Sequence, residues 1–324
     1  MRAVQYDRFG PPDVLHVTEV PKPVPGSREV LVEVYGAGVD AGETAFRAGR
    51  MRGITRTAFP RGTGGDFAGR VAAVGAQVRG RQPGDRVWGV MPHFTFGAIA
   101  EYVVVPADRL AAAPGNIGLL EAAALPVSGT TALTALTDKA HLLPGERLLV
   151  RGGAGGVGSL AVQLGKALGA HVTALAGARN LDRVAALGAD EVLDYRVTRP
   201  DDLGRFDVIV DLVGTGLGAY RARLTRNGRM IALAFDPDRV VASMLTTGLR
   251  AALRPRRIKL FSNNPPPERL AELARRVEKG DLRPVIHAVL PMDDIADAHR
   301  GLEAGGVHGK YVVDMGRSRG DDRT

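Results

Sequence analysis

The sequence predicts an α/β protein with a β-rich, mostly antiparallel part at its N-terminal end and a doubly wound parallel sheet after it. Up to about residue 120, short alternating runs are broken by Gly and Pro, which is typical of antiparallel strands. From about 121 to 260, near-continuous apolar strands alternate with helical patterns, which favours a parallel sheet covered on both faces. A glycine-rich turn, Gly152–Gly158, separates one of these strands from a helix.

Length and composition fit a globular protein of two domains or one large domain. The chain has 324 residues, of which 45% are hydrophobic and 24% are charged. No run of about 18 uninterrupted apolar residues is present, so we expect no membrane-spanning helix. Residues Met1–Gly10 alternate like a strand and lack the apolar core of a signal peptide, which predicts a cytoplasmic protein without a membrane partner.

Charge and cysteine content argue against two further classes of function. The net charge is +8, but the basic residues are scattered and aromatic residues do not interleave with them. A groove for single-stranded nucleic acid combines both kinds of residue, so we expect no nucleic-acid partner. The chain has no cysteine, which excludes disulfides and thiolate metal sites.

The N-terminal segment is predicted as a series of short strands separated by proline- and glycine-containing turns. The turns are marked by Pro11-Pro12, Pro25-Gly26 and Pro83-Gly84. The expected strands are Ala3–Tyr6, Val30–Tyr35, Gly69–Val74, Arg86–Val90 and Ala100–Val105.

The central segment is predicted to alternate strands and helices. The strand Arg147–Val150 is followed by the helix Val157–Leu168, which Gly169 can end. Asn180 is placed to cap a second helix that runs to Leu187. The further strands are expected at Val172–Leu175, Glu191–Asp194, Asp207–Val213 and Arg229–Ala234.

The last segment returns to a mixed pattern. We expect an amphipathic helix at Pro267–Glu278, a strand at Val285–Leu290, a helix at Ile295–Glu303 and a strand at Lys310–Asp314. The polar tail Gly316–Thr324 is expected to be disordered.

The glycine-rich turn predicts a dinucleotide site. Gly153, Gly155 and Gly158 match the pattern G-x-G-x-x-G directly after a strand and at the start of a helix. Glycines in this context let the backbone approach a pyrophosphate, whose charge is then stabilised at the helix N-terminus. The predicted cofactor-binding residues of the turn are Gly153, Ala154, Gly155, Gly156, Val157 and Gly158.

The residues after the second strand favour NADP(H) over NAD(H). An NAD site places Asp or Glu about 20 residues after the turn, where it binds the ribose 2′-hydroxyl. Here that strand ends as Ala174-Leu175-Ala176-Gly177-Ala178-Arg179, without a carboxylate. Arg179 offers a cation for a 2′-phosphate, which is the preferred interpretation; the alternative is a solvated charge at a helix start.

Ten motifs in register resemble the medium-chain dehydrogenase/reductase superfamily, specifically its zinc-free quinone oxidoreductase branch, from Met1 to about Met315. They are GAGVDAGETAFRAG (36–49), GTGGDFAGRVAAVG (62–75), PGDRVWG (83–89), FGAIAEYVVVP (96–106), LPVSGTTAL (125–133), GGAGGVG (152–158), LGADEVLDY (187–195), FDVIVDLVG (206–214), NGRMIAL (227–233) and GKYVV (309–313).

The resemblance implies a domain organisation. Residues 1–120 would form the first part of a GroES-like catalytic domain, 121–260 a Rossmann NADP-binding domain, and 261–324 the return to the catalytic domain with a disordered tail. It also implies a cofactor cleft between the domains and a homodimer.

The resemblance implies further cofactor residues: Thr131 near the nicotinamide, Tyr195 near the adenosine 2′-phosphate, and Val213 and Gly214 along the cofactor. Lys310 is expected to close the fold rather than to perform chemistry.

The metal positions of the family's zinc-dependent members are replaced. Asp40 or a neighbour stands where those members have an early Cys, and their GHE motif reads Gly64-Gly65-Asp66. We therefore expect no zinc site. The zinc-free branch has Asn-x-x-Asp where this chain has Asp40 and Glu43, so the resemblance implies that Asp40 orients the nicotinamide ribose or contacts substrate. A helix cap is the other interpretation of Asp40.

A zinc-free enzyme of this kind would reduce an acceptor that is already electrophilic, such as a quinone or an α,β-unsaturated carbonyl. The candidate proton donors are Tyr6, His93 and Tyr102, although solvent could supply the proton. His93 lies in the run Met91–Gly97, whose Phe94 and Phe96 could stack on a flat substrate or pack within the loop.

Three hypotheses of function follow. The leading one is an NADPH-dependent quinone or enone reductase acting on a small carbonyl substrate. The alternatives are an enoyl-thioester reductase that acts on coenzyme A or acyl-carrier-protein substrates, and a noncatalytic NADPH-binding protein. The basic run Arg250–Lys259 could contact the phosphates of such a carrier or be a solvated connection.

Overall fold

The computed structural model describes residues 1–52, 58–93, 95–234, 247–248 and 257–317. They form two compact units: Met1–Thr130 with Asn264–Gly305 and the segment from Lys310 onward, and Thr131–Asn263 with Gly306–Gly309. The chain therefore passes from the first unit to the second ten residues later than the predicted boundary at 120, and it returns briefly to the second unit at 306–309. No helix among the described residues is long and apolar enough to cross a membrane.

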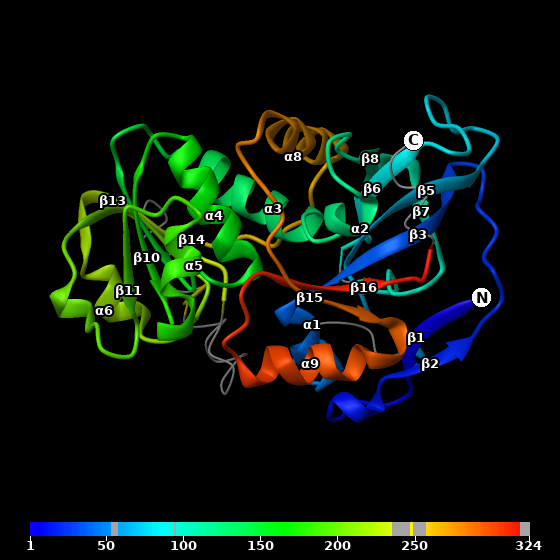
Figure 1. The fold of residues 1–324 in the computed structure, drawn as a ribbon, viewed down its shortest axis with the longest axis horizontal. Helices are drawn as coiled ribbons and strands as arrows, with labels where there is room; N and C mark the ends of the chain where they lie inside the picture. The colour runs from blue at the N-terminus through cyan, green and yellow to red at the C-terminus, as the bar shows by residue number, and fades with distance from the viewer. Residues whose placement is uncertain (53–57, 94, 235–246, 249–256, 318–324) are drawn as a thin grey trace. The chain divides into compact units, whose positions relative to one another are not determined.

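The first unit is built on a strand-rich sheet whose order is β15-β16-β3-β5-β6-β8, with β7 also paired to β3 (Figure 1). A second, small sheet has the order β2-β1-β4. All the pairings are antiparallel except that of β15 with β16, which confirms the predicted β-rich, mostly antiparallel part. The strands are β1 (Arg2–Tyr6), β2 (His16–Glu19), β3 (Glu29–Val39), β4 (Arg61–Gly62), β5 (Asp66–Val74), β6 (Arg86–Val90), β7 (Tyr102–Pro106), β8 (Leu110–Ala112), β15 (Ile286–Pro291) and β16 (Lys310–Asp314).

Helices pack around these strands. The amphipathic helix α8 buries Leu270, Leu273 and Val277, packs against β8, and ends at Gly280, whose φ of 86° continues the chain in the left-handed region. The helices of this part of the chain are α1 (Ala41–Arg47), α2 (Leu119–Ala122), α3 (Pro126–Leu133), α8 (Pro267–Lys279) and α9 (Ile295–Ala304), with short 3₁₀ turns η1 (Pro12–Val14), η2 (Ala107–Arg109) and η6 (Met292–Asp294).

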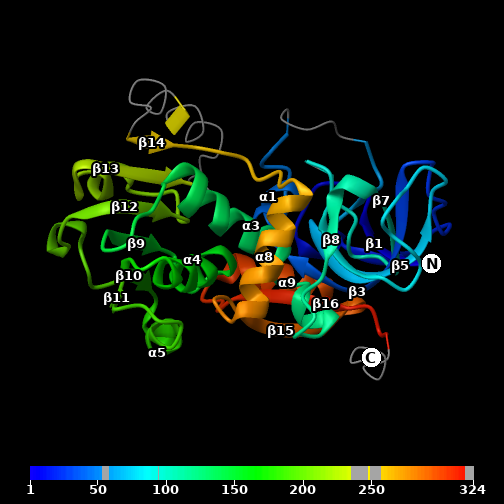
Figure 2. The ribbon, with the colours of Figure 1, turned by 90° about the horizontal axis from the view of Figure 1, so that it is seen from above.

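The second unit is a parallel sheet with the strand order β11-β10-β9-β12-β13-β14, a succession that can be followed in Figure 2. This order reverses direction between β9 and β12, as in a Rossmann fold. The elements are η3, a π-helical turn (Thr134–Lys139), β9 (Arg147–Arg151), α4 (Gly156–Ala167), β10 (His171–Ala176), η4 (Ala178–Asn180), α5 (Leu181–Ala185), β11 (Glu191–Asp194), η5 (Pro200–Asp202), β12 (Phe206–Asp211), α6 (Leu217–Arg221), β13 (Leu224–Ala232) and β14 (Ile258–Lys259).

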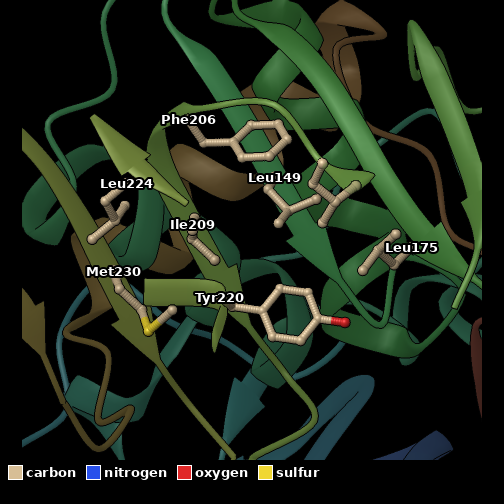
Figure 3. Close-up of a cluster of buried hydrophobic side chains, with 8 residues drawn as sticks. Leu149, Leu175, Phe206, Ile209, Tyr220, Leu224 and Met230 are labelled. Atoms are coloured by element: carbon tan, nitrogen blue, oxygen red, sulfur yellow. The ribbon is translucent and has the colours of Figure 1, made fainter. Parts of the chain in front are cut away.

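One hydrophobic cluster fixes α6 and the strands of this sheet to one another. Figure 3 shows Leu149 of β9, Ile209 of β12 and Met230 of β13 grouped with Tyr220 of α6. Apolar side chains from neighbouring parallel strands meet on one face, and burying each contributes about 1.5–3 kcal/mol. The remaining members of the cluster are Leu175, Leu203, Phe206 and Leu224.

Several predicted elements of the second unit differ in their bounds from the structure; β13, for example, is Leu224–Ala232 rather than Arg229–Ala234. Strand β12 ends at Asp211 rather than Val213, because the Asp211 carboxylate accepts the N–H of Gly214 and turns the chain. Asn180 makes no side-chain cap to α5; its Nδ2 donates to the carbonyl of Gly306 at 3.3 Å.

Some predictions fall outside the described residues. These are Phe94, residues 250–256 of the basic run and residues 318–324 of the tail.

A buried histidine lies on α9. Both ring nitrogens of His299 lack a hydrogen-bond partner among the described residues. The neighbouring helix α1 carries the buried Arg47, which forms an ion pair with Glu303. Burial, together with the Arg47 cation, lowers the pKa of His299 to about 4 from its ordinary value of 6.5.

His299 therefore makes the protein sensitive to acid. The folded state favours the neutral form of His299. The contribution of His299 to the free energy of unfolding is therefore fully present above pH 6.5 and is lost as the pH falls through 6.5 toward 4. At about 1.4 kcal/mol per pKa unit, the loss approaches about 3 kcal/mol. Urea unfolding at pH 7.5 and 4.5 should show that His299→Leu removes most of this loss and that His171→Leu, at an exposed histidine, does not. Equal pH dependence in wild type and His299→Leu would contradict the assignment.

Candidate functional site

The glycine-rich turn joins β9 to α4 in the second unit. Gly152 has a φ of 84°, and a Cβ on Gly158 would lie only 2.0 Å from the carbonyl oxygen of Gly152. A side chain at Gly158 would therefore push the first turn of α4 away from the end of β9. Gly155 stands at the N-cap position, and the helix then runs for 12 residues.

This turn has the properties of a pyrophosphate site. The N–H groups of the first helical turn include those of Gly156, Val157 and Gly158, and they stand at the positive end of the helix dipole. An added Cβ on Gly155 would meet only the Gly152 carbonyl, at 3.6 Å, so its outer side is open. The residues therefore fit the phosphates of a dinucleotide, as predicted from the sequence.

The turn lies beside the point at which the strand order reverses. Strands β9 and β12 are neighbours in the sheet, and their carboxyl ends are Arg151 and Asp211. Val213, in the turn after β12, is 40% exposed, and Gly214 has a φ of 84°. In open α/β sheets ligands bind at this reversal, outside the carboxyl ends of the strands.

A distant segment packs onto the same turn. The N–H of Gly309 donates to the carbonyl of Ala154 at 2.7 Å, and Gly309 forms a parallel bridge with Gly155. Asn180 holds Gly306, the other end of the segment Gly306–Gly309. Sequence reasoning did not find this segment, because its partners Ala154 and Asn180 are far away along the chain and no local pattern links them.

The ends of β10 and β11 carry the residues expected near a 2′-phosphate. Arg179 is exposed in η4 and makes no hydrogen bond or ion pair with the residues that the structure describes. Tyr195 follows β11, and a Cβ on Gly177 would lie 3.4 Å from its ring. The guanidinium of Arg196 lies 5.7 Å from the centroid of the Tyr195 ring. Two cations and an aromatic ring thus gather where an NAD site would have a carboxylate.

Thr131 is placed differently from the residues of the glycine-rich turn. It lies in α3 and is buried. The role of Thr131 near the nicotinamide stays a prediction.

The first unit contains a buried ionic cluster of Lys310, Asp40 and Asp66. The Lys310 Nζ donates to Asp66 Oδ2 at 2.7 Å and to Asp40 Oδ2 at 3.0 Å. The side chains of Lys310 and Asp66 are 2% and 0% exposed, whereas that of Asp40 is 21% exposed. Asp40 is therefore the partly exposed member of the cluster, whereas Lys310 and Asp66 are buried beneath it.

The sheet explains how these distant residues meet. Lys310 begins β16, Asp66 begins β5, and Asp40 follows β3, which lies between those two strands. Burial alone lowers the pKa of Lys310, but the two carboxylates raise it above its ordinary value. The lysine is therefore a permanent cation, and besides joining β16 to the sheet its ammonium holds Asp40.

Glu43 is a second buried carboxyl beside the cluster. It accepts hydrogen bonds from the hydroxyl of Thr63 and from the N–H groups of Gly64 (2.7 Å) and Asp40 (3.1 Å). Burial, and next the charge of Asp40, raises the pKa of Glu43 to about 7. Asp40 stands at the N-cap position of α1, so both interpretations of Asp40, helix start and charged contact, agree with the fold.

A zinc ion does not fit these residues. The sequence has no cysteine, and among the described residues no group of three or more His, Asp or Glu side chains is arranged to hold a metal. Asp40 and Asp66, at positions related to the family's metal motifs, are bonded instead to the Lys310 ammonium. A tetrahedral site would need ligands that this cluster does not supply.

The remaining predicted catalytic residues are placed separately. Tyr6 is buried in β1, where its ring meets Phe59 edge-on, and burial raises its pKa. His93 is exposed in the turn after β6, while Phe96 packs against Phe46 of α1. The roles of Tyr6 and His93 as proton donors stay predictions.

Comparison with known proteins agrees with these features. Residues 26–115 match the alcohol dehydrogenase GroES-like domain, and residues 187–313 match the family described as zinc-binding dehydrogenase. The chain is 33% identical over 327 residues to a chloroplast envelope quinone oxidoreductase homolog of Arabidopsis thaliana, covering 97% of this chain and 98% of the relative.

Two other proteins extend the comparison. A 2-methylene-furan-3-one reductase of Solanum lycopersicum is 33% identical and is aligned over 97% of this chain and 79% of its own. The structure of the quinone oxidoreductase from Coxiella burnetii has a TM-score of 0.87 and 30% identity, covering 97% of this chain and 99% of that one.

The parallel sheet and its glycine-rich turn define a nicotinamide-dependent oxidoreductase. The chain belongs to the medium-chain dehydrogenase/reductase superfamily, in its zinc-free quinone oxidoreductase branch.

The ionic cluster generates a prediction about stability. Lys310→Met should lower the free energy of unfolding by about 3–5 kcal/mol, because it leaves the buried Asp66 carboxylate without its cation. Urea unfolding of wild type and variant measures this difference. Lys279→Met, at an exposed lysine, should change it by less than about 1 kcal/mol. Adding Asp66→Asn to Lys310→Met should restore part of the loss, and a loss unchanged by that addition would contradict the pairing.

Proposed function

We propose that this protein is an NADPH-dependent reductase that transfers hydride to a quinone or an α,β-unsaturated carbonyl. The observation that carries the proposal is the dinucleotide turn at Gly152–Gly158, together with Arg179 beyond the neighbouring strand. Arg179 makes no hydrogen bond or ion pair with the described residues. The names of the relatives support both acceptor types, since one is a quinone oxidoreductase homolog and another reduces an unsaturated furanone.

The preference for NADPH rests on charge. A 2′-phosphate needs cations, and Arg179 and Arg196 stand at the ends of β10 and β11. Residues 174–179 contain no acid that would repel the phosphate or bind a free 2′-hydroxyl.

The bound nicotinamide would supply the hydride. The chain's own part is to bind and orient. We propose that Asp40, held by Lys310, orients the nicotinamide ribose or contacts the substrate, because it is the part of the ionic cluster that reaches the surface. An acceptor that is already electrophilic needs positioning more than a Lewis acid. The homodimer and the cytoplasmic location stay predictions from the sequence.

Arg179→Ala tests the cofactor preference. It should raise the Kd for NADPH by about tenfold to a hundredfold, because a charge-assisted hydrogen bond contributes about 1.5–3 kcal/mol, and it should leave the Kd for NADH unchanged. Titration of the protein with each cofactor measures both constants. Arg183→Ala, an exposed arginine on α5, is the matched control. An unchanged ratio of the two constants in Arg179→Ala would show that Arg179 does not read the phosphate.

A panel of acceptors tests the reaction. NADPH oxidation followed at 340 nm should be fast with quinones or enones and should survive a metal chelator. Turnover confined to enoyl thioesters would favour the thioester reductase instead. Tight NADPH binding without oxidation of any acceptor would favour a noncatalytic binding protein, and loss of activity with chelator would contradict a zinc-free mechanism.

A further inference from the structure

A buried ion pair joins the carboxyl ends of the two strands at which the parallel sheet reverses its order. Arg151 is the last residue of β9, and Asp211 is the last residue of β12. They are partners in the register of the two strands, and an Arg151 Nη1 donates to Asp211 Oδ1. Both side chains are buried, although each stands at the edge of the sheet where ligands bind.

The second oxygen of Asp211 shapes the turn that follows. Asp211 Oδ2 accepts the N–H of Gly214 at 2.9 Å, and the N–H of Val213 also bonds to the carboxylate. Gly214 has a φ of 84°, a conformation that a glycine adopts without strain. The carboxylate therefore acts as the cap of the turn Leu212–Gly214.

Arg151 is itself held in a fixed orientation. Its guanidinium stacks 3.6 Å from the centroid of the Tyr220 ring. Tyr220 comes from α6 and belongs to the hydrophobic cluster of the sheet, as Figure 3 shows. A planar guanidinium can stack on a ring and point a donor at a carboxylate at the same time, which a lysine ammonium cannot do.

The pair also brings the two turns of the cofactor edge together. The N–H of Leu212 donates to the carbonyl of Arg151 at 3.3 Å. A Cβ on Gly152 would lie 3.4 Å from the Cβ of Leu212, so the glycine-rich turn and the turn after β12 are in contact. A shift of the Asp211 carboxylate would move the second turn relative to the first.

We propose that Arg151 and Asp211 are positioning residues of the dinucleotide site, which hold the turn Leu212–Gly214 at a fixed distance from the glycine-rich turn. The inference rests on the proposed binding of NADPH and adds the residues that set the shape of its site. The sequence carried one signal of it, since a charged residue at the end of each of two buried strands needs a partner.

Stability alone is a weak reason for such a pair. Replacing a buried ion pair by apolar residues of similar volume is often neutral or stabilising. Burial raises the pKa of Asp211 although Arg151 opposes the effect, so the surroundings of Asp211 disfavour its ionised form. The directional bonds to Val213 and Gly214 are what an apolar residue could not replace.

The test is Arg151→Met in the full chain. NADPH titration should give a Kd about tenfold or more above that of wild type, and any kcat measured at saturating NADPH should change by less than threefold. Arg147→Met is the matched control: it makes the same change at the other, exposed end of β9 and should leave the Kd unchanged. Arg151→Lys keeps the charge but loses the stacking, and it should lie between wild type and Arg151→Met.

Hydrogen exchange provides a second readout that does not depend on the cofactor. The amides of Val213 and Gly214 should exchange at least tenfold faster in Arg151→Met and Asp211→Asn than in wild type, and at the wild-type rate in Arg147→Met. If Arg151→Met binds NADPH with the wild-type Kd, or if these amides stay protected, the pair does not position the turn. Failure of wild type to bind NADPH would overturn the proposed function, while the exchange rates would still decide whether the pair holds the turn.

Discussion

The close contact between Gly158 and the carbonyl of Gly152 is the constraint on which the dinucleotide edge depends. With only 2.0 Å available to a Cβ, glycine is required, and its presence lets α4 start directly over the end of β9. That start directs the free N–H groups of the helix outward at the carboxyl edge of the sheet. The other parts of the edge are arranged around this contact: Gly309 bonds to Ala154, the turn after β12 touches Gly152, and Arg179 stands beyond β10.

Each unit also contains a buried pair of opposite charges at a strand end. Lys310 binds Asp40 and Asp66 in the first unit, and Arg151 binds Asp211 in the second. Burying charges costs desolvation free energy, which the attraction between them offsets only when the geometry is good and the remaining polar atoms are bonded. The first cluster meets this condition only in part, because Asp66 Oδ1 has no hydrogen-bond partner among the described residues. In both units the ionic contact fixes a group near the surface. In the first unit the Lys310 ammonium holds Asp40, and in the second unit the Asp211 carboxylate holds the turn Leu212–Gly214.

The ionic cluster of the first unit bears on why this branch of the superfamily functions without zinc. The carboxylates that stand at metal-related positions are committed to a lysine ammonium, whose pKa is raised by both of them. An ammonium offsets part of the charge of the two carboxylates without offering an open coordination position, so it cannot polarise a substrate oxygen as a metal does. The acceptors proposed above, quinones and enones, are electrophilic without a metal, which agrees with this arrangement.

The strands with clear apolar patterns, the glycine-rich turn, the absence of an acid after β10 and, through its motifs, the family could all be predicted from the sequence alone. These signals are local, so a short window of residues contains them. No helix was predicted at α3, because its sequence, PVSGTTAL, mixes apolar residues with Ser, Gly and Thr and shows no amphipathic period, although nearly all of these residues are buried. Only the tertiary structure joined Lys310 to Asp40, Gly309 to Ala154 and Arg151 to Asp211. These partners lie on separate strands, where sheet register rather than sequence spacing decides which side chains meet.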